Sequence, residues 1–254
     1  MRGLKDKVFI VAGGGSGIGA ATAQRLAEEG AAVVVGDIHQ ENARQVAGEI
    51  VAGGGKALAV QFDMAIDTSV GALVSAAVEK FGGLDGMHVN AADLVAIKSD
   101  TDALSVPLDI FDRTLAVNLR GHLLCTRHAL PELLKRGGGS MVYTSSAAAY
   151  FAGPQRVSYG MSKSGLHSLV RHVATRWGKE KVRSNAIAPG LVMTDTLRRG
   201  LPEQEQRAHV TRALSWRLGE GKDIAAAVAF LLSSDGEWIT GQVLCVDGGL
   251  TVRA

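Results

Sequence analysis

The segment Val8-Phe-Ile-Val-Ala-Gly-Gly-Gly-Ser-Gly-Ile-Gly19 decides the fold of this chain. A short apolar run at 8–11 leads directly into closely spaced glycines, and a helical pattern follows at about 16–29. Glycines let the backbone turn tightly and approach a diphosphate, to which the N-terminus of the following helix presents free N–H groups. The alternative is an ordinary glycine-rich turn. Because this loop joins a predicted strand to a predicted helix, Gly13, Gly17 and Gly19 favour nucleotide binding.

Short β-branched runs alternate with longer helical patterns along the rest of the chain. Such alternation predicts an α/β protein in which a doubly wound parallel sheet carries helices on both faces. No linker-like segment divides residues 1–254, so we expect a single domain. The strands are expected at 8–11, 32–35, 57–61, 87–89, 140–144, 182–187 and 243–246, and the helices at about 16–29, 41–52, 68–81, 108–134, 157–177 and 223–232.

The composition bounds the class of protein and of partner. Hydrophobic residues make up 46% and charged residues 20% of the chain, as in a compact soluble globule. The net charge of +2 gives no strong attraction to nucleic acid or to an anionic membrane. The chain shows neither an apolar signal core near its start nor a stretch of about 20 apolar residues that would span a bilayer.

The two cysteines, Cys125 and Cys245, both lie in apolar runs. Buried thiols in a reducing, cytoplasmic compartment are therefore expected. The sequence leaves a disulfide between the two residues open.

Asp37 closes the second predicted strand, twenty residues after Gly17. An acidic side chain at this place accepts hydrogen bonds from the ribose hydroxyls of NAD and repels the 2′-phosphate of NADP. The next residue, Ile38, is not basic, and no arginine follows before Arg44. The alternative is a loop aspartate that starts the next helix. Together with the glycine loop, Asp37 favours NAD as the cofactor.

Tyr159 and Lys163 stand four residues apart in a helical pattern, and Ser146 precedes Tyr159 by thirteen residues. Side chains four apart project from the same face of a helix. A free tyrosine has a pKa of about 10, and a neighbouring cation favours its phenolate, so we expect Lys163 to lower the pKa of Tyr159. The pair alone is more typical of a solvated helix face. It gains meaning from the glycine loop and Asp37.

With these residues in place, the chain resembles the classical subgroup of the short-chain dehydrogenase/reductase family. The resemblance covers residues 7–249, and its specificity lies in the order and spacing of the motifs rather than in any one of them. Beyond the residues named so far, it rests on Asp63, Asn90-Ala91, Asn118, Pro189-Gly190 with Thr194, and Asp247-Gly248-Gly249.

The resemblance implies an NAD(H)-dependent oxidoreductase that interconverts a secondary alcohol and a ketone by hydride transfer. Tyr159 would be the general acid/base, and Ser146 would donate a hydrogen bond to the substrate oxygen. Lys163 would lower the pKa of Tyr159 and bind the nicotinamide ribose, and Asn118 would hold a water that links Lys163 to solvent. Physical chemistry agrees, because hydride transfer leaves an alkoxide-like oxygen that preorganised donors stabilise.

The resemblance also implies a homotetramer and a Rossmann-like sheet of about seven strands in the order 3-2-1-4-5-6-7. The cofactor would lie across the carboxyl ends of the strands, where the strand order reverses. Ser16 and Ile18 would meet the diphosphate and ribose, and Asp63 and Met64 would flank the adenine. The remaining cofactor-binding residues are Gly13, Gly17, Gly19, Asp37, Ile38, Asn90, Ala91, Tyr159 and Lys163, with Pro189, Gly190, Val192 and Thr194 at the nicotinamide end.

Three residues depart from the family pattern. Ala12 stands where the family usually has threonine, and Val89 and Ala92 replace the first asparagine and the glycine of Asn-Asn-Ala-Gly. Loss of both partners of a buried hydrogen bond can be nearly neutral, whereas loss of one is costly. We therefore expect Ala12 and Val89 to form a compensated apolar contact. Ala92 adds a Cβ near the cofactor and is expected to weaken cofactor binding.

The walls of the substrate site are expected at 94–97, 147–151, Val157 and 191–217, where the last segment is long and irregular enough for a lid. Tyr150 and Phe151 predict an apolar site. Helix 108–134 is apolar on more than one side, which predicts either a subunit contact or full burial within one chain. The arginines of the lid either capture a carboxylate or form solvated helix faces; they are Arg198, Arg199, Arg207 and Arg212.

The histidines predict no metal site, because neither His122 and His128 nor His167 and His172 have the i,i+4 spacing of a helical ligand pair. Two other functions stay open beside the alcohol dehydrogenase. They are an epimerase or dehydratase on the same scaffold and a non-catalytic NAD-binding sensor. The substrate, the stereochemistry and the direction of the reaction do not follow from the sequence.

Overall fold

The computed structural model describes residues 1–151 and 153–252, without the side chains of Asp195, Thr196 and Arg199. Seven parallel strands form one sheet in the order β3-β2-β1-β4-β5-β6-β9, which confirms the expected fold and strand order. The seventh strand is numbered β9 because two short strands precede it. The strands are β1 Val8–Ala12, β2 Ala32–Asp37, β3 Lys56–Gln61, β4 Gly86–Val89, β5 Gly139–Thr144, β6 Val182–Pro189 and β9 Val243–Val246.

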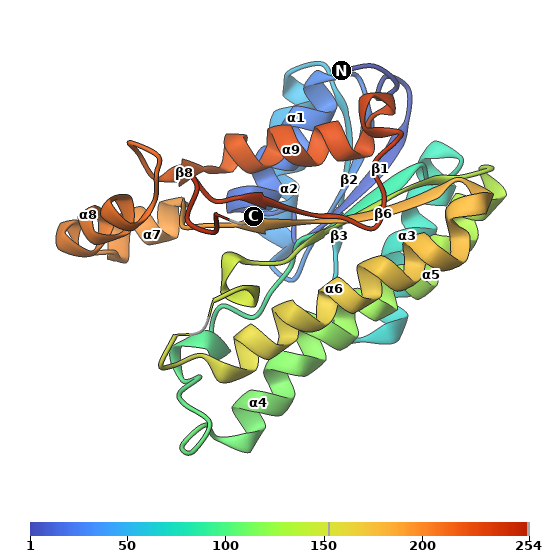
Figure 1. Ribbon diagram of the computed structural model, residues 1–254. Coiled ribbons are helices and arrows are strands. Elements are labelled where there is room, and N and C mark those ends of the chain that lie inside the picture. Colours follow the sequence, from blue (N-terminus) through green and yellow to red (C-terminus); the bar gives the residue numbers. More distant parts are fainter. Residues whose placement is uncertain (152, 253–254) are drawn as a thin grey trace.

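Helices cover both faces of the sheet (Figure 1). One face carries α1, α2 and α9, and the other carries α3, α5 and α6, with α4 leading into α5. The helices are α1 Gly17–Glu28, α2 Gln40–Ala52, α3 Asp67–Phe81, α4 Leu108–Leu115, α5 Gly121–Lys135, α6 Val157–Trp177 and α9 Gly221–Leu232.

The alternation of side chains along β1 shows why the sheet is buried on both faces. Ile10 points into the core that contains α3, α5 and α6, whereas Phe9 and Val11 point into the core that contains α1, α2 and α9. Every residue of β1, β2 and β4 is buried. A parallel sheet covered on both faces requires such continuous apolar runs, which explains why the central strands could be found from the sequence.

The expected helix 108–134 is interrupted. α4 ends at Leu115, a π-helical turn spans Ala116–Arg120, and α5 continues from Gly121 to Lys135. Asn118 lies in the middle of this turn and is fully buried. π-Helical turns inside α-helices frequently occur at functional sites, because they redirect a side chain from the regular helical face.

Segment 191–217 has its own secondary structure. It contains β7 (Val192–Met193), α7 (Asp195–Gly200) and α8 (Glu203–Arg212), and β7 pairs with β8 (Gly219–Glu220) outside the main sheet. Figure 1 shows α7 and α8 projecting from the body of the molecule, beyond the end of the sheet. The predicted lid is therefore a helical excursion, and its closure over a substrate stays a prediction.

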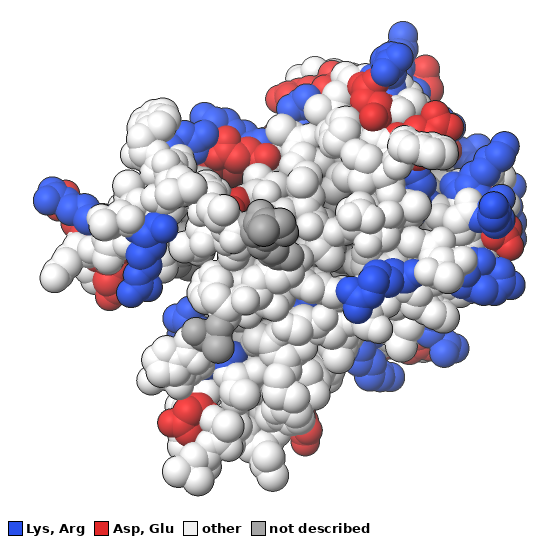
Figure 2. All heavy atoms as spheres, viewed as in Figure 1, with Lys and Arg blue, Asp and Glu red and all other residues white. Residues whose placement is uncertain are grey.

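The surface carries charges of both signs. Figure 2 shows basic and acidic side chains interspersed around the rim of one face, whose centre is largely uncharged. Among the described residues, no helix combines the length and the apolar character that crossing a membrane requires. Cys125 is a free thiol buried in α5, which excludes the disulfide with Cys245 that the sequence left open.

Candidate active site

The glycine loop between β1 and α1 is held close to the end of β2. The N–H groups of Gly13 and Gly14 donate to the carbonyl of Gly36 at 2.7 and 2.9 Å. Gly13 has a φ of 83°, in the left-handed region that favours glycine. A Cβ on Gly19 would stand 1.8 Å from the carbonyl oxygen of Gly13, so α1 can approach the loop only with a glycine there.

The N-terminus of α1 fits an anionic group. Ser16, the N-cap residue, is exposed, and its side chain makes no capping hydrogen bond. The first turn of α1 contains no acidic residue, so the N–H groups and the positive end of the helix dipole are open to a diphosphate. Thr194 packs against the start of α1, because a Cβ on Gly17 would meet the Cγ2 of Thr194 at 2.8 Å.

Asp37 ends β2 beside the same loop. Its Oδ2 accepts a hydrogen bond from the N–H of Gly15 at 2.9 Å, and its Oδ1 accepts one from the N–H of His39 at 3.0 Å. Ile38 is 55% exposed directly beyond it. The carboxylate therefore stands at the glycine loop, where an acidic side chain can accept hydrogen bonds from an adenosine ribose.

Four residues from three parts of the chain form the candidate catalytic group. Ser146 follows β5, Tyr159 and Lys163 lie on α6, and Asn118 lies in the π-helical turn. The Nζ of Lys163 stands 5.8 Å from the centre of the Tyr159 ring, so the two side chains are neighbours as their spacing predicts. Lys163 is buried, and its Nζ donates to the carbonyl oxygen of Thr144 at 2.8 Å.

The pKa of Tyr159 differs from the expectation. Burial raises the pKa of Tyr159 above its ordinary value, against smaller lowering effects of the Ser146 hydroxyl and the Arg156 charge. Burial also lowers the pKa of Lys163 to about 7. The net shift of the Tyr159 pKa is therefore opposite to the expected one, because desolvation outweighs these lowering effects, while a lowering contribution from Lys163 stays a prediction.

Ser145 anchors α6 beside the candidate catalytic group, and Asn118, a member of this group, is itself anchored by the backbone of Asp93. The buried hydroxyl of Ser145 donates to the carbonyl of Lys163 at 3.2 Å and accepts from the Nε2 of His167 at 2.8 Å. Ser145 thus fixes α6 to β5, while Ser146 faces the phenol, as the thirteen-residue spacing predicts. The Oδ1 of Asn118 accepts from the N–H of Asp93 at 2.8 Å, and its Nδ2 has no partner among the described residues.

Asn90, which follows β4, links the ends of β1 and β5 through its side chain. Its Nδ2 donates to the carbonyl of Gly13 at 2.9 Å, and its Oδ1 accepts from the Thr144 hydroxyl at 3.0 Å. Ala12 and Val89 are register partners in neighbouring strands, and both are fully buried. The departures at these two positions therefore form an apolar contact, while Asn90 maintains the polar connection between the strands.

Ala12→Thr is expected to lower the free energy of unfolding by about 1–3 kcal/mol, because its hydroxyl would be buried against Val89 without a partner. Urea unfolding measures this loss. The double variant Ala12→Thr/Val89→Asn restores a partner and should recover part of it. A clear stabilisation by Ala12→Thr alone would contradict the apolar contact.

A buried histidine, His88, is hydrogen-bonded to the Thr144 hydroxyl that also contacts Asn90. The Thr144 hydroxyl donates to Asn90, so the Nε2 of His88 donates to Thr144, at 2.9 Å. The Nδ1 of His88 has no partner among the described residues, and burial lowers the pKa of His88 to about 3. His122, also buried, has its pKa lowered by burial and, to a smaller extent, by the Lys163 charge.

The free energy of unfolding should therefore fall in mild acid. Below pH 6.5 the unfolded chain binds a proton at His88 that the folded chain does not bind until about pH 3. One such histidine costs about 2 kcal/mol between pH 8 and pH 5, since each pH unit below the unfolded pKa costs about 1.36 kcal/mol. Urea unfolding of His88→Val at both pH values should show a smaller loss. Substitution of exposed His172 is the control, and an unchanged pH dependence in His88→Val would contradict the argument.

The predicted nicotinamide end is formed where β6 ends. Gly190 packs closely on the turn after β9, because a Cβ on it would stand 2.9 Å from the Cα of Asp247. Val192 is buried in β7, and the hydroxyl of Thr194 caps α7 through the N–H of Leu197. Met64 is buried, and a Cβ on Gly121 would meet its Cγ at 2.2 Å. The structure thus gives Met64 a core position, while its contact with adenine stays a prediction.

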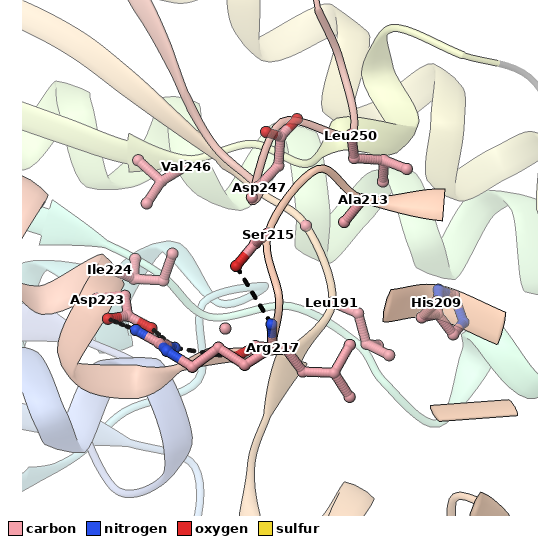
Figure 3. Close-up of a pocket in the computed structure, with 14 residues that line it drawn as sticks. Leu191, His209, Ala213, Ser215, Arg217, Asp223, Ile224, Val246, Asp247 and Leu250 are labelled. Carbon is pink, nitrogen blue, oxygen red and sulfur yellow. Dashed lines mark hydrogen bonds and ion pairs between the residues drawn. The ribbon is translucent and has the colours of Figure 1, made fainter. Parts of the chain in front are cut away.

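Two cavities adjoin segment 191–217. The first, of about 150 Å³, lies behind Gly190, where Arg217 makes a two-pronged ion pair with Asp223 at 2.7 and 2.8 Å (Figure 3). The second, of about 600 Å³, lies between α8 and the Arg217–Glu220 region. Of the described residues, none that lines either cavity belongs to the candidate catalytic group, although the first cavity includes Gly190 of the predicted nicotinamide end.

Two of the four arginines named for the lid have acidic neighbours. Arg198 lies 3.8 Å from Glu220, and Arg207 lies 2.6 Å from Glu203. These pairs favour the solvated, ion-paired alternative over carboxylate capture. The prediction for Arg199 concerns a side chain outside the described part of the chain.

Comparison with known proteins agrees with this geometry. A family model described as enoyl-(acyl carrier protein) reductase matches residues 12–251. A probable short-chain type dehydrogenase/reductase of Bradyrhizobium diazoefficiens is 41% identical over 97% of this chain and 88% of its own length. The 7α-hydroxysteroid dehydrogenase of Bacteroides fragilis is 33% identical over 100% of this chain and 97% of its own length.

A solved structure shows the same fold. The structure of a 7α-hydroxysteroid dehydrogenase complexed with NADH and 7-oxo glycochenodeoxycholic acid superimposes with a TM-score of 0.91 at 33% identity. The match covers 97% of this chain and 95% of that chain. The chain therefore belongs to the short-chain dehydrogenase/reductase family of oxidoreductases.

Proposed function

We propose that the chain is an NAD-dependent alcohol dehydrogenase that interconverts a secondary alcohol and a ketone. The observation that carries this proposal is the convergence of Ser146, Tyr159 and Lys163. Lys163 is buried against the carbonyl of Thr144, and the Thr144 hydroxyl is linked through Asn90 to Gly13 of the glycine loop. A bound nicotinamide supplies a hydride acceptor or donor. Tyr159 exchanges a proton with the substrate oxygen, and Ser146 donates a hydrogen bond that positions this oxygen.

The pKa shifts of Tyr159 and Lys163 suggest what Lys163 and Asn118 do in the proposed reaction. A Tyr159 pKa raised by burial has to fall before the phenol can act as a base, and the cationic form of Lys163 favours that fall. Since burial lowers the pKa of Lys163 to about 7, cofactor contacts that stabilise its cation activate the pair. The orphan Nδ2 of Asn118 is available to hold a water that connects Lys163 to solvent.

NAD rather than NADP is proposed from Asp37. Its carboxylate stands next to the N–H of Gly15, and exposed Ile38 follows it without a basic group. A 2′-phosphate at the ribose would meet this carboxylate, and like charges in contact cost several kcal/mol. The cofactor-binding residues expected from the sequence complete the site.

The substrate is proposed to be a small apolar alcohol or ketone. Figure 2 shows an indentation between the projecting α7–α8 segment and the body that carries α4. Leu94, Val95 and Phe151 are exposed apolar residues of the walls expected from the sequence. We expect them to contact the substrate when segment 191–217 closes.

A homotetramer in the cytoplasm is proposed as the working form. Exposed apolar side chains lie on α4, α5 and α6, namely Leu108, Leu123 and Met161. They accord with a subunit contact formed by these three helices. Light scattering tests the assembly. The buried free thiol of Cys125 accords with a reducing compartment.

A panel of secondary alcohols and ketones, read by the absorbance of NADH or NADPH, tests the activity. Reduced cofactor should accumulate with an alcohol and NAD, and much less with NADP. Product formation without net NADH would indicate an epimerase or dehydratase. Tight NADH binding without turnover of any substrate would indicate a sensor.

A further inference from the structure

The N-terminus of α6, the helix that carries Tyr159 and Lys163, is closed by a distant segment. Arg156 precedes the helix with a φ of 69°, and its side chain makes no cap. The N–H of Arg156 donates to the carbonyls of Asp100 and Thr101 at 3.1 and 3.0 Å, and the N–H of Val157 donates to Thr101 at 3.2 Å. The segment at 100–101 therefore replaces a local helix cap.

The carboxylate of Asp100 satisfies the next N–H groups of the same helix. Its Oδ1 accepts from the N–H and the hydroxyl of Ser158 at 3.1 and 2.8 Å. Its Oδ2 accepts from the N–H of Tyr159 at 2.8 Å. Asp100 is only 3% exposed, and its negative charge faces the positive end of the α6 dipole. The backbone of the proposed acid/base is thus bonded directly to a buried carboxylate from 59 residues away.

The other end of the same segment contacts a second catalytic candidate. The N–H of Asp93 donates to Asn118, and the Oδ1 of Asp93 accepts from the N–H groups of Val95 and Ala96 at 2.9 and 2.8 Å. Between these anchors Leu94 and Val95 are 64% and 69% exposed. Residues 93–100 therefore connect a proposed substrate wall to Asn118 at one end and to Tyr159 at the other.

We infer that Asp100 is a positioning residue for Tyr159, which fixes the first turn of α6 so that the phenol meets the substrate oxygen bound against residues 93–100. This inference rests on the proposed function for the role of Tyr159. Misplacement of a reacting group by about 1 Å can cost about 100-fold in rate. Asp100 is expected to act on kcat, because the glycine loop and Asp37 hold the cofactor independently of it.

Asp100→Asn separates a positioning role from simple burial. An asparagine has one side-chain oxygen, so it can accept from Ser158 or from Tyr159 but cannot replace both carboxylate oxygens. Asp100→Ala removes all three bonds, and Ser158→Ala removes only the hydroxyl donor. Asp102 provides the matched control, because its carboxylate caps Leu104 and Ser105 within its own exposed loop.

The test measures kcat per NADH-binding site for the full chain and these four variants. We expect kcat to fall about 10- to 100-fold in Asp100→Ala, less in Asp100→Asn and least in Ser158→Ala, with unchanged NADH affinity and normal turnover in Asp102→Ala. If Asp100→Ala fails to fold, Asp100→Asn and Ser158→Ala still decide the question. A kcat within about twofold of the parent in Asp100→Asn would overturn the inference.

Amide hydrogen exchange keeps this test separate from the proposed function. Residues 157–160 should exchange faster in Asp100→Asn than in the parent or in Asp102→Ala, whatever the substrate. If the parent protein turns over no alcohol but this local loss of protection is found, the proposed function fails and the hold of Asp100 on α6 stands. Parent-like protection of residues 157–160 in Asp100→Asn would overturn the hold itself.

Discussion

Tyr159→Phe should lower kcat by about 10³-fold or more while NADH binding stays close to that of the parent. General acid–base catalysis contributes about 10²–10⁴-fold, and the variant removes the only atom of Tyr159 that can exchange a proton. The ring itself stays beside Lys163, whose Nζ is 5.8 Å from its centre, so the packing of α6 is preserved. Steady-state turnover with the best alcohol of the panel and fluorescence titration with NADH measure the two quantities.

Tyr143→Phe is the matched control for this variant. Tyr143 is fully buried in β5, where its hydroxyl shares a hydrogen bond of 2.8 Å with the Thr126 hydroxyl of α5. Its loss should reduce the free energy of unfolding by about 1 kcal/mol and leave turnover per NADH-binding site unchanged. Near-normal turnover in Tyr159→Phe would remove Tyr159 from the mechanism.

The sequence was sufficient to locate the sheet because continuous apolar runs mark β1 and most of β2. The runs 8–11 and 32–35 are buried on both faces, and the glycine loop between them marks the first crossover. The strand order came from the family resemblance rather than from the pattern. That the chain is a single domain stays a prediction.

Features that depend on distant contacts could not be predicted from the sequence. The π-helical turn around Asn118 leaves no mark in a continuous apolar pattern, so one long helix was expected instead of two. Asp100 lies in a polar loop, where a carboxylate usually indicates a turn, and its contact with Tyr159 crosses 59 residues. The sequence of α7 and α8 indicates an irregular segment because it lacks a clear apolar stripe.

The direction in which the Tyr159 pKa is shifted could not be predicted from the sequence for a different reason. Sequence spacing placed the Lys163 cation next to the phenol, but spacing carries no measure of desolvation. In the folded protein, burial is the largest effect on both groups and acts against the charged form of each. The proposed catalytic pair could therefore be located from the sequence, while the directions of its pKa shifts could not.

Asp37→Asn/Ile38→Arg should shift the ratio of kcat/KM for NADP to that for NAD by about 100-fold or more toward NADP. The first substitution removes the charge that would face a 2′-phosphate, and the second supplies a cation at an exposed position. Contact between like charges costs several kcal/mol, and each 1.4 kcal/mol is tenfold in affinity. Initial rates at several concentrations of each cofactor, with one alcohol, measure the ratio.

Asp37 also supports the glycine loop, so the affinity for NAD has to be separated from the choice of cofactor. An asparagine at position 37 keeps one oxygen for the N–H of Gly15 or of His39 but not for both. A general weakening of both cofactors is therefore expected, and only their ratio reports on the 2′-phosphate. Asp63→Asn is the control, because this acid belongs to the predicted adenine end and should affect both cofactors equally. An unchanged ratio in the double variant would mean that another group chooses the cofactor, and Asp37 would keep only its structural contact with the loop.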